Sequence, residues 1–273
     1  MRKIIALLVS VVFLFNCTSF TVDAERTDVQ KGIDFLLERG YSYEEIINTF
    51  PEDDLEIIST ATGLTRSETC YEVSESGKVV REVNNKKSTY NIVPGQDTES
   101  TSGGKLTQTV SAFSLNDKKV LVTYTFKWND TPVNLKTDCC AVLFDGAKLE
   151  NVRSAYYQYT SRNLASGSDN TVTVNRPTST SSGGVGIDFK FVKDSTHAGG
   201  IKDHQNYNHR GYISCIATIT SGKCINVWSR YYHQEGKLSL SPSISIDGVS
   251  VSLSNTLQMV LMNPNPYVSC KVN

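Results

Sequence analysis

Most of this chain alternates apolar and polar residues with a period of two, from about Ser67 onward. The clearest run is Ser243–Ser252, in which Ser alternates with Ile and Val on both sides of Asp247-Gly248. This period places neighbouring side chains on opposite faces of an extended strand, so that one face can be buried while the other meets water. Such strands recur without a helical pattern between them, and they predict a mainly β protein with antiparallel sheets in a β-sandwich-like domain.

Turn residues between alternating runs predict three β-hairpins. The hairpins pair Leu106–Leu115 with Lys118–Trp128, Gly211–Ile219 with Ile225–Tyr232 across Ser221-Gly222, and the two halves of Ser243–Ser252. A further strand is expected at Val185–Phe191, where every second residue is apolar. Two polar stretches interrupt the alternation and are expected to be loops: Ser161–Gly184, rich in Ser, Thr, Asn and Gly, and Lys193–Arg210, which contains three of the four histidines.

The segment before the alternating region carries helical signals, from Glu25 to about Gly63. Asp28 can cap a first helix, and the capping box Ser42-Tyr43-Glu44-Glu45 opens a second. Pro51 opens a third helix with acidic residues in its first turn, where the helix dipole favours them. We therefore expect a short helical segment at residues 25–65, as a small bundle, a pro-segment or a docking element. An all-β domain is expected at residues 66–273.

The N-terminus has the pattern of an export signal. Arg2 and Lys3 precede an apolar run, Ile4–Phe15, which is shorter than the roughly 20 residues that a membrane-spanning helix needs. Val22-Asp23-Ala24 supplies a cleavage site, so we expect a signal peptide at residues 1–24 with cleavage after Ala24. The alternatives are an N-terminal membrane anchor and a lipid on Cys17. With the signal removed, no integral membrane segment is expected, and the protein is predicted to be secreted and extracellular.

The charge balance argues against nucleic acid as a partner. The chain has 27 Lys and Arg against 28 Asp and Glu, and loss of Arg2, Lys3 and Asp23 with the signal takes the net charge from −1 to −2. A nearly neutral chain has no electrostatic reason to bind nucleic acid. The sequence also contains no nucleotide-binding loop, and no cofactor is expected.

In an exported chain the cysteines are expected to form disulfides. Cys17 is lost with the signal, and the disulfide candidates that remain are Cys70, Cys139, Cys140, Cys215, Cys224 and Cys270. An even number in an exported chain predicts up to three disulfides. Adjacent Cys139 and Cys140 should not bridge each other, and the register of a hairpin at Ser221-Gly222 disfavours the pair Cys215 and Cys224. The alternative is a set of buried free thiols that pack as small hydrophobes.

The histidines are the candidates for chemistry. His204 and His209 lie in a polar stretch with His197 and Asp203, and His233 follows in a later strand. Imidazole binds metals and transfers protons, so His204, His209 and His233 are candidate metal ligands or acid–base residues. Their spacing supports no preformed site, because residues five apart should face opposite sides of a strand. No catalytic residue is nominated, since the sequence has no Gly-x-Ser-x-Gly elbow, Cys-x-x-Cys pair or His-Glu-x-x-His motif.

The polar stretch Ser161–Gly184 also permits a membrane-active interpretation. A polar hairpin with alternating arms, here Thr171–Val174 and Val185–Phe191, is of the kind that β-pore-forming toxins unfold into a membrane. A spanning strand needs about 9–11 residues of alternation, and both arms are shorter. A long surface loop is the alternative.

Two short stretches carry a resemblance to known proteins. Gly40–Ile46 (GYSYEEI) and Tyr231–Ile246 (YYHQ…LSLSPSISI), together with the export signal, resemble a class of uncharacterised exported proteins of Gram-positive bacteria. The resemblance implies a bacterial, extracellular setting and no particular activity. Our first hypothesis is a secreted, non-enzymatic β-rich protein that binds an envelope component or another protein. The alternatives are a β-pore-forming or membrane-damaging protein and an enzyme, metal-dependent or not, built on the histidine loop.

Overall fold

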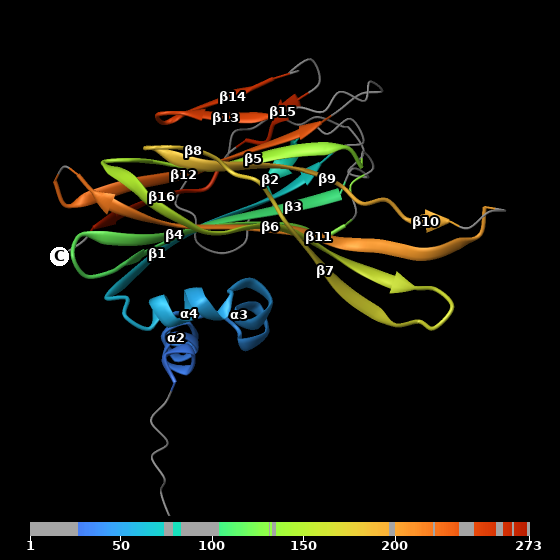
Figure 1. Ribbon diagram of the computed structural model, residues 1–273, viewed down its shortest axis with the longest axis horizontal. Coiled ribbons are helices and arrows are strands. Elements are labelled where there is room, and N and C mark those ends of the chain that lie inside the picture. The colour runs from blue at the N-terminus through green and yellow to red at the C-terminus, as the bar shows by residue number, and fades with distance from the viewer. Residues whose placement is uncertain are drawn as a thin grey trace, which may run out of the picture.

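The computed structural model describes residues 27–73, 79–82, 104–130, 132, 135–196, 200–220, 222–234, 243–254, 259–263 and 265–271. The predicted signal peptide with its cleavage site, Cys17 and His197 lie outside these residues. The chain is mainly β, with antiparallel sheets preceded by short helices (Figure 1). None of the helices in the described residues has the length and hydrophobicity that a membrane crossing requires.

Three short helices open the described chain, as the capping signals predict. They are α2 (Asp28–Leu37), α3 (Tyr43–Thr49) and α4 (Glu52–Ile58). The cap of α2 is Thr27, one residue before the predicted Asp28, because the threonine side chain accepts the hydrogen bond from the backbone N–H of Gln30. At α3 the predicted capping serine is present: Ser42 Oγ accepts from the backbone N–H of Glu45 at 3.1 Å.

The larger sheet, sheet A, runs in the order β2-β1-β3-β4-β11-β6-β7, and β10 pairs with β11. Its strands are β1 (Gly63–Val73), β2 (Val79–Glu82), β3 (Gly104–Ser114), β4 (Lys119–Trp128), β6 (Ala147–Asn163), β7 (Asp169–Asn175), β10 (Ser195–Thr196) and β11 (Lys202–Ile219). The predicted hairpin around Asn116-Asp117 is confirmed, since β3 and β4 pair with Val110 opposite Tyr124. The strands begin at Gly63, slightly before the expected boundary at residue 66.

The second sheet, sheet B, runs in the order β15-β12-β5-β9-β8, and β16 pairs with β12. Its strands are β5 (Thr137–Asp145), β8 (Ser179–Ser181), β9 (Gly184–Lys190), β12 (Cys224–Gln234), β15 (Met259–Leu261) and β16 (Tyr267–Lys271). A separate hairpin of β13 (Ile244–Asp247) and β14 (Ser250–Leu253) turns at the predicted Asp247-Gly248. Figure 1 shows the helices, sheet A, sheet B and this hairpin stacked in that order.

Apolar side chains of both sheets meet in one core. The ring of Phe126 on β4 stacks on that of Phe189 on β9, with centroids 4.9 Å apart. Trp128 Nε1 on β4 donates a hydrogen bond to Tyr231 Oη on β12 at 2.9 Å. These side-chain contacts join the two sheets, which share no strand pairing within the described residues.

One predicted hairpin is wrong. Gly211–Ile219 lies in β11 of sheet A, whereas Ile225–Tyr232 lies in β12 of sheet B. The connection between them therefore passes from one sheet to the other. The same turn signal occurs whether the second run pairs with the first as a hairpin or crosses to another sheet, so it does not predict the pairing.

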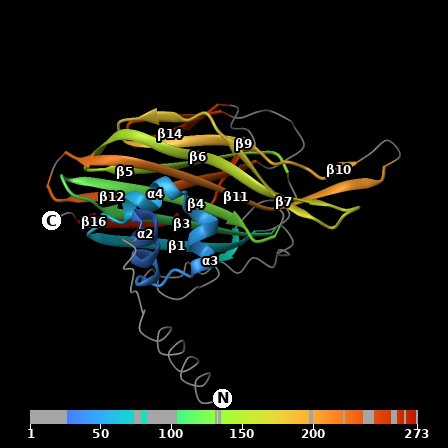
Figure 2. The same cartoon turned by 60° about the horizontal axis from the view of Figure 1, so that its bottom comes forward.

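The two polar stretches that were expected to be loops are mostly strands. Ser161–Gly184 contains the end of β6, β7 and β8, and Lys193–Arg210 contains β10 and the first half of β11. The arms proposed for a membrane hairpin are also separated, since Thr171–Val174 belongs to sheet A and Val185–Phe191 to sheet B. The ends of the paired strands β6 and β7, and β10 with the first part of β11, project beyond the rest of the molecule, and we call this projection the arm (Figures 1 and 2).

The six described cysteines are free thiols, and no pair lies at disulfide distance. The disulfide candidates therefore form no bridge in this structure. Cys139 and Cys140 point to opposite faces of β5, as expected, and pack in different apolar clusters. Burial raises the pKa of the Cys215 thiol to about 12, so this group stays protonated and packs as a small hydrophobe.

The helical segment shares a core with sheet A, as a docking element would. Its side chains Ile33, Leu36, Ile46, Phe50, Leu55 and Ile58 pack against Phe113, Leu115, Leu121, Tyr212 and Ile216. Figure 2 shows the helices lying over the face of this sheet. Buried Asp54 of α4 anchors the contact, because it accepts hydrogen bonds from Arg153 Nε at 2.6 Å and from Tyr212 Oη at 2.8 Å.

Replacing Asp54 with alanine should lower the free energy of unfolding by about 2 kcal/mol, since two hydrogen bonds to a carboxylate are lost. The loss is moderated because the Arg153 side chain is 23% exposed and can bind water in the variant. Chemical denaturation measures this change, and Asp53→Ala is the matched control because Asp53 is exposed. Equal stability of the two variants would contradict the anchoring role of Asp54.

Candidate ligand-binding groove

The outer face of sheet A is divided into an apolar half and a polar half. Phe113, Leu121 and Ile216 form the apolar half, which the helices cover. Further along the same strands, the outward positions are taken by Thr109, Thr125 and other polar residues that the helices leave partly open. This change from apolar to polar along one face decides where the helices dock and where a groove remains.

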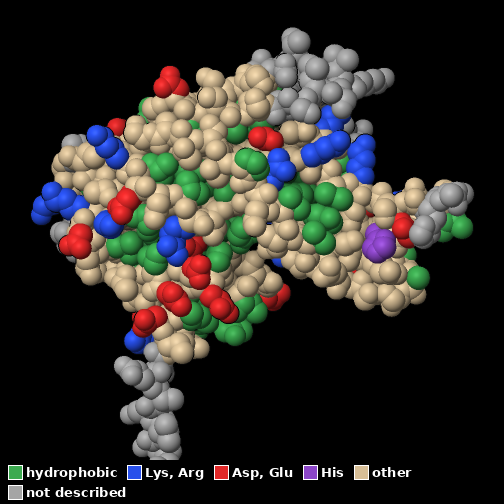
Figure 3. Space-filling view, viewed as in Figure 1, with side chains coloured by type: hydrophobic (Ala, Val, Ile, Leu, Met, Phe, Trp, Pro, Cys, Tyr) green, Lys and Arg blue, Asp and Glu red, His purple; other side chains and the backbone are tan. Residues whose placement is uncertain are grey.

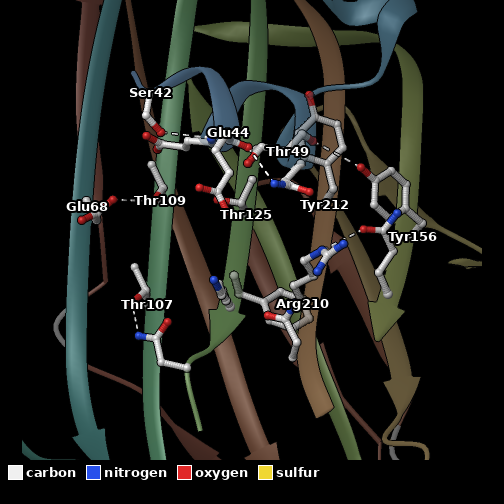
Figure 4. A pocket seen from close by; sticks show the side chains of 17 residues that line it. Ser42, Glu44, Thr49, Glu68, Thr107, Thr109, Thr125, Tyr156, Arg210 and Tyr212 are labelled. Carbon is white, nitrogen blue, oxygen red and sulfur yellow. Dashed lines mark hydrogen bonds between the residues drawn. The ribbon is translucent and has the colours of Figure 1, made fainter. Parts of the chain in front are cut away.

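The groove lies between α3 and the polar half of this face, with a volume of about 510 Å³ (Figure 4). Its lining comes from α3 and its cap, from β1, β3, β4, β6 and β11, and is almost wholly polar. The residues are Ser42, Glu44, Glu45, Asn48, Thr49, Glu68, Thr107, Thr109, Thr125, Phe126, Lys127, Asn129, Tyr156, Gln158, Asn208, Arg210 and Tyr212.

The floor of the groove is built from two rows of directly opposite residues across neighbouring strands. Residues opposite each other in an antiparallel ladder point to the same face. The first row is Thr107, Lys127, Arg210 and Gln158, and the second is Glu68, Thr109, Thr125, Tyr212 and Tyr156. Because every member stands on a paired strand, the floor is rigid before any ligand binds.

A β-bulge in β11 aims Arg210 into the groove. Tyr207 is opposite Thr160 and Arg210 is opposite Gln158, so two residues of β11 stand against one residue of β6. Asn208, one of those two, has a φ of 56°, a left-handed conformation that asparagine tolerates. The extra residue reverses the alternation of β11 and brings Arg210 to the outer face.

Two cations of the floor have no carboxylate partner. Among the described residues, neither Lys127 nor Arg210 lies within ion-pair distance of an Asp or Glu. Arg210 Nε donates to Gln158 Oε1 at 2.9 Å, and burial lowers the pKa of its guanidinium. The acidic residues Glu45 and Glu68 are occupied by Arg66, at 2.7 and 2.8 Å. Because Arg66 is shared by two carboxylates and Glu44 also lines the groove, the charges balance overall, and the positive charge is confined to the end with Lys127 and Arg210.

The groove is polarised along its length. Figure 4 shows Arg210 and Thr107 at the end away from Ser42 and Glu44, which belong to α3 and its cap. On the face seen in Figure 3, acidic side chains gather over the helices. A ligand with a negatively charged group would thus be directed towards the Arg210 end.

The candidate histidines lie elsewhere. His209 is buried in the core, where its Nδ1 is hydrogen-bonded to Tyr157 Oη. His233 is buried at one end of β12, with its Nδ1 2.9 Å from Asp138 Oδ2. His204 is on the arm, beside Asp203 and Ser195.

The structure brings no three of these side chains together. Within the described residues, no group of three or more His, Cys, Asp or Glu side chains could hold a metal ion. Each histidine instead has its own local partner. The bulge in β11 also changes which face of the strand His209 points to. His204 is opposite Asn163, which lies on the inner face of sheet A with Tyr157, and His209 stacks on Tyr157. His204 and His209 therefore point to the same side of the sheet, although they are five residues apart.

Neither Lys127 nor Arg210 is among the residues that the sequence nominates. Lys127 occupies a polar position on the same strand face as Thr123 and Thr125, so the polar face of this strand could be found from its alternation. Arg210 ends a polar stretch, and the bulge that turns it outward has no clear sequence pattern. The pairing of the two cations becomes visible only through the register between β4 and β11.

Comparisons with known proteins identify no family. No family model matches the chain, and no curated protein matches it. Among solved structures, a pore forming protein is similar at 12% identity, covering 63% of this chain and 87% of that one with a TM-score of 0.27. Clostridium perfringens delta-toxin is similar at 6% identity, covering 62% and 84% with a TM-score of 0.27.

The Clostridium perfringens NetB toxin in its membrane-inserted form is similar at 12% identity, covering 76% of this chain and 94% of that one with a TM-score of 0.23. At TM-scores this low, the similarities support neither a shared fold nor a shared activity.

Proposed function

We propose that this is a secreted, non-enzymatic β-sandwich protein that acts by binding a component of the cell envelope, with the polar groove on sheet A as its binding site. The observation that carries the proposal is the preformed floor of the groove. It presents hydroxyl, amide and cationic groups on paired strands, and two of its cations have no carboxylate partner within the described residues.

The chemistry of the lining supports binding rather than catalysis. The described lining contains neither histidine nor cysteine, and two of its three carboxylates, Glu45 and Glu68, are held in ion pairs with Arg66, while Glu44 lies at the end away from Arg210. Threonine, asparagine, glutamine and arginine are hydrogen-bonding residues that orient a polar ligand. None of these four residue types ordinarily acts as a general base.

The sandwich assignment is part of the proposal. Its support is the shared core, in which Phe126 of sheet A and Phe189 of sheet B stack face to face. The export assignment rests on the pattern of residues 1–24. Together they support the proposal that the groove belongs to an exported β scaffold.

Filling the groove should abolish envelope binding. Asn129 lines the groove and is exposed, so Asn129→Trp places a bulky ring there without changing the charge and with little effect on folding. We expect the amount of purified protein that sediments with cell envelopes to fall about tenfold or more, as when about 1.4 kcal/mol of binding free energy is lost. Thr125→Phe, at the centre of the floor, should act in the same way.

Thr171→Phe is the matched control, because Thr171 is an exposed threonine of sheet A outside the groove. Melting temperatures show that each variant is folded. Full envelope binding by folded Asn129→Trp and Thr125→Phe would place the site elsewhere. If the wild-type protein is not enriched on envelopes over an unrelated secreted protein, the proposed function is wrong.

A second candidate function, membrane damage, is favoured by the tip of the arm. Leu164 and Ile201 are 44% and 72% exposed there, and the backbone N–H of Leu164 donates to the carbonyl of Asp203. Hydrophobic side chains are visible at this tip in Figure 3. Dye release from liposomes tests the candidate, and the double variant Leu164→Ser, Ile201→Ser should lose the release. No release by wild-type protein from several lipid mixtures would remove this candidate.

A further inference from the structure

Lys127 and Arg210 form an unusual pair because two like charges stand directly opposite each other. They are register partners on β4 and β11, and they point to the same face of sheet A. Side chains in this relation have Cβ atoms roughly 4.5–5.5 Å apart, and like charges so placed repel each other. Such an arrangement is stabilised when an anion lies between the two cations.

Several other cations of sheet A are neutralised by carboxylates, although the exposed Lys148 of β6 has none within ion-pair distance among the described residues. Lys119 is 2.7 Å from Glu150, and Lys119 stands on the same strand and the same face as Lys127. Arg66, Lys105 and Arg153 likewise have acidic partners. The groove differs from these positions in that two unpaired cations stand directly opposite each other on neighbouring strands.

The donors around the pair come from β11, from β4 and from Asn129, which directly follows β4. Gln158 accepts the hydrogen bond from Arg210 Nε and so fixes the plane of the guanidinium. The two Nη atoms of Arg210 make no hydrogen bond within the described residues. Asn129 Nδ2 donates one of its two hydrogens to Thr107 Oγ1 at 3.0 Å, and Thr107 in turn donates to Cys70 Sγ at 3.4 Å. Within the described residues, the second amide hydrogen of Asn129 is therefore the one left for a ligand. With the ammonium of Lys127, these groups offer donors from several directions.

We propose that Lys127 and Arg210 bind a phosphate group of the ligand, with the amide of Asn129 as a further donor. The proposal rests on the function proposed above and names the chemistry of that site. A carboxylate has two acceptor oxygens in one plane, whereas a phosphate presents oxygens in a tetrahedron and can engage all three side chains together. Glu44, at the opposite end of the groove, disfavours the anion there and fixes its orientation.

Titration with inorganic phosphate is the direct test. Chemical-shift or calorimetric titration of the full mature chain should give saturable binding that weakens as the salt concentration rises. Lys127→Gln and Arg210→Gln should each weaken phosphate binding about tenfold or more, since each removes a charge-assisted contact. Lys127→Arg should restore most of the affinity, because it keeps the charge.

Lys119→Gln is the matched control, since this lysine already has a carboxylate partner, and it should bind phosphate as the wild type does. Melting temperatures confirm that the glutamine variants are folded. Wild-type affinity for phosphate in folded Lys127→Gln and Arg210→Gln, or an equal loss in Lys119→Gln, would overturn the assignment. Absence of saturable phosphate binding in the wild type would overturn it as well.

Two further arms identify the source of the phosphate. A soluble poly(glycerol phosphate) chain should compete with inorganic phosphate if the ligand is a phosphodiester polymer. Vesicles containing phosphatidylglycerol should compete if it is a lipid headgroup. Competition in either arm that is lost in Arg210→Gln supports the phosphate site, whereas failure of both to displace phosphate contradicts a phosphate-bearing ligand.

The outcomes separate the two proposals. If Asn129→Trp abolishes envelope binding while Lys127→Gln and Arg210→Gln do not, the groove is the binding site and the phosphate assignment is wrong. If the glutamine variants lose inorganic phosphate but the wild type does not bind envelopes, the phosphate site stands and the proposed envelope function is wrong.

Discussion

Replacing Asp138 with alanine should lower the free energy of unfolding by about 3–5 kcal/mol. The carboxyl group is fully buried and accepts hydrogen bonds from Tyr231 Oη at 2.6 Å, from the backbone N–H of Gln234 at 3.1 Å, and from His233 Nδ1 at 2.9 Å when that nitrogen carries hydrogen. Alanine would leave all three buried groups without their acceptor. Chemical denaturation at neutral pH measures the loss.

The effect should reach both sheets. Tyr231 also accepts the hydrogen bond from Trp128, so the network joins β5 and β12 of sheet B to β4 of sheet A. Asp138→Asn is the matched control, because its amide oxygen can still accept, and it should cost less, about 1–2 kcal/mol. If the alanine variant loses less than about 1 kcal/mol, the network does not hold this end of the sheets together.

Acidification from pH 6.5 to pH 4 should destabilise the protein by up to about 3 kcal/mol through His209 alone. Burial lowers the pKa of His209 from 6.5 to about 4, so the folded protein keeps this side chain neutral where the unfolded chain already binds a proton. The contribution of His209 is therefore fully present above pH 6.5 and is lost as the pH falls to about 4. Urea denaturation at a series of pH values measures this slope.

The variant His209→Gln isolates this term, because glutamine can still accept a hydrogen bond from Tyr157 but does not titrate. Carboxylates away from His209, such as Asp169, whose pKa is lowered by its hydrogen bond to Arg162, contribute in both proteins and cancel in the difference. We expect a flatter dependence of stability on pH in the variant between pH 6.5 and 4. Equal slopes in the two proteins would show that His209 does not titrate with a lowered pKa.

Local patterns predict the elements of this fold more reliably than their pairing. The turn at Asp247-Gly248 and the capping serine Ser42 are present where they are expected, because each depends on a few neighbouring residues. The hairpin expected between β11 and β12 is wrong, because identical alternation suits a strand that pairs with its predecessor and one that crosses to another sheet. The polar stretches expected as loops are strands, since Thr and Asn in the arm still pair through their backbones.

The histidine candidates and the groove both show that the sequence does not predict which side chains meet in the fold. His204, His209 and His233 are close enough in sequence to suggest a site, yet each is held by a different partner in the structure. Lys127 and Arg210 give no such suggestion, and they become neighbours because β4 pairs with β11. The register shift at Asn208 also brings Arg210 to the same face as Lys127, since one extra residue changes the face to which every later side chain of the strand points.

The sequence by itself determined the class of the chain: short capped helices followed by antiparallel strands, because periodicity and capping are properties of adjacent residues. Only the tertiary structure decided which strands are neighbours, that the helices cover the apolar half of sheet A, and that two unpaired cations meet in the remaining polar half. Strand register joins residues far apart in the chain and depends on the packing of whole faces. No local pattern specifies it.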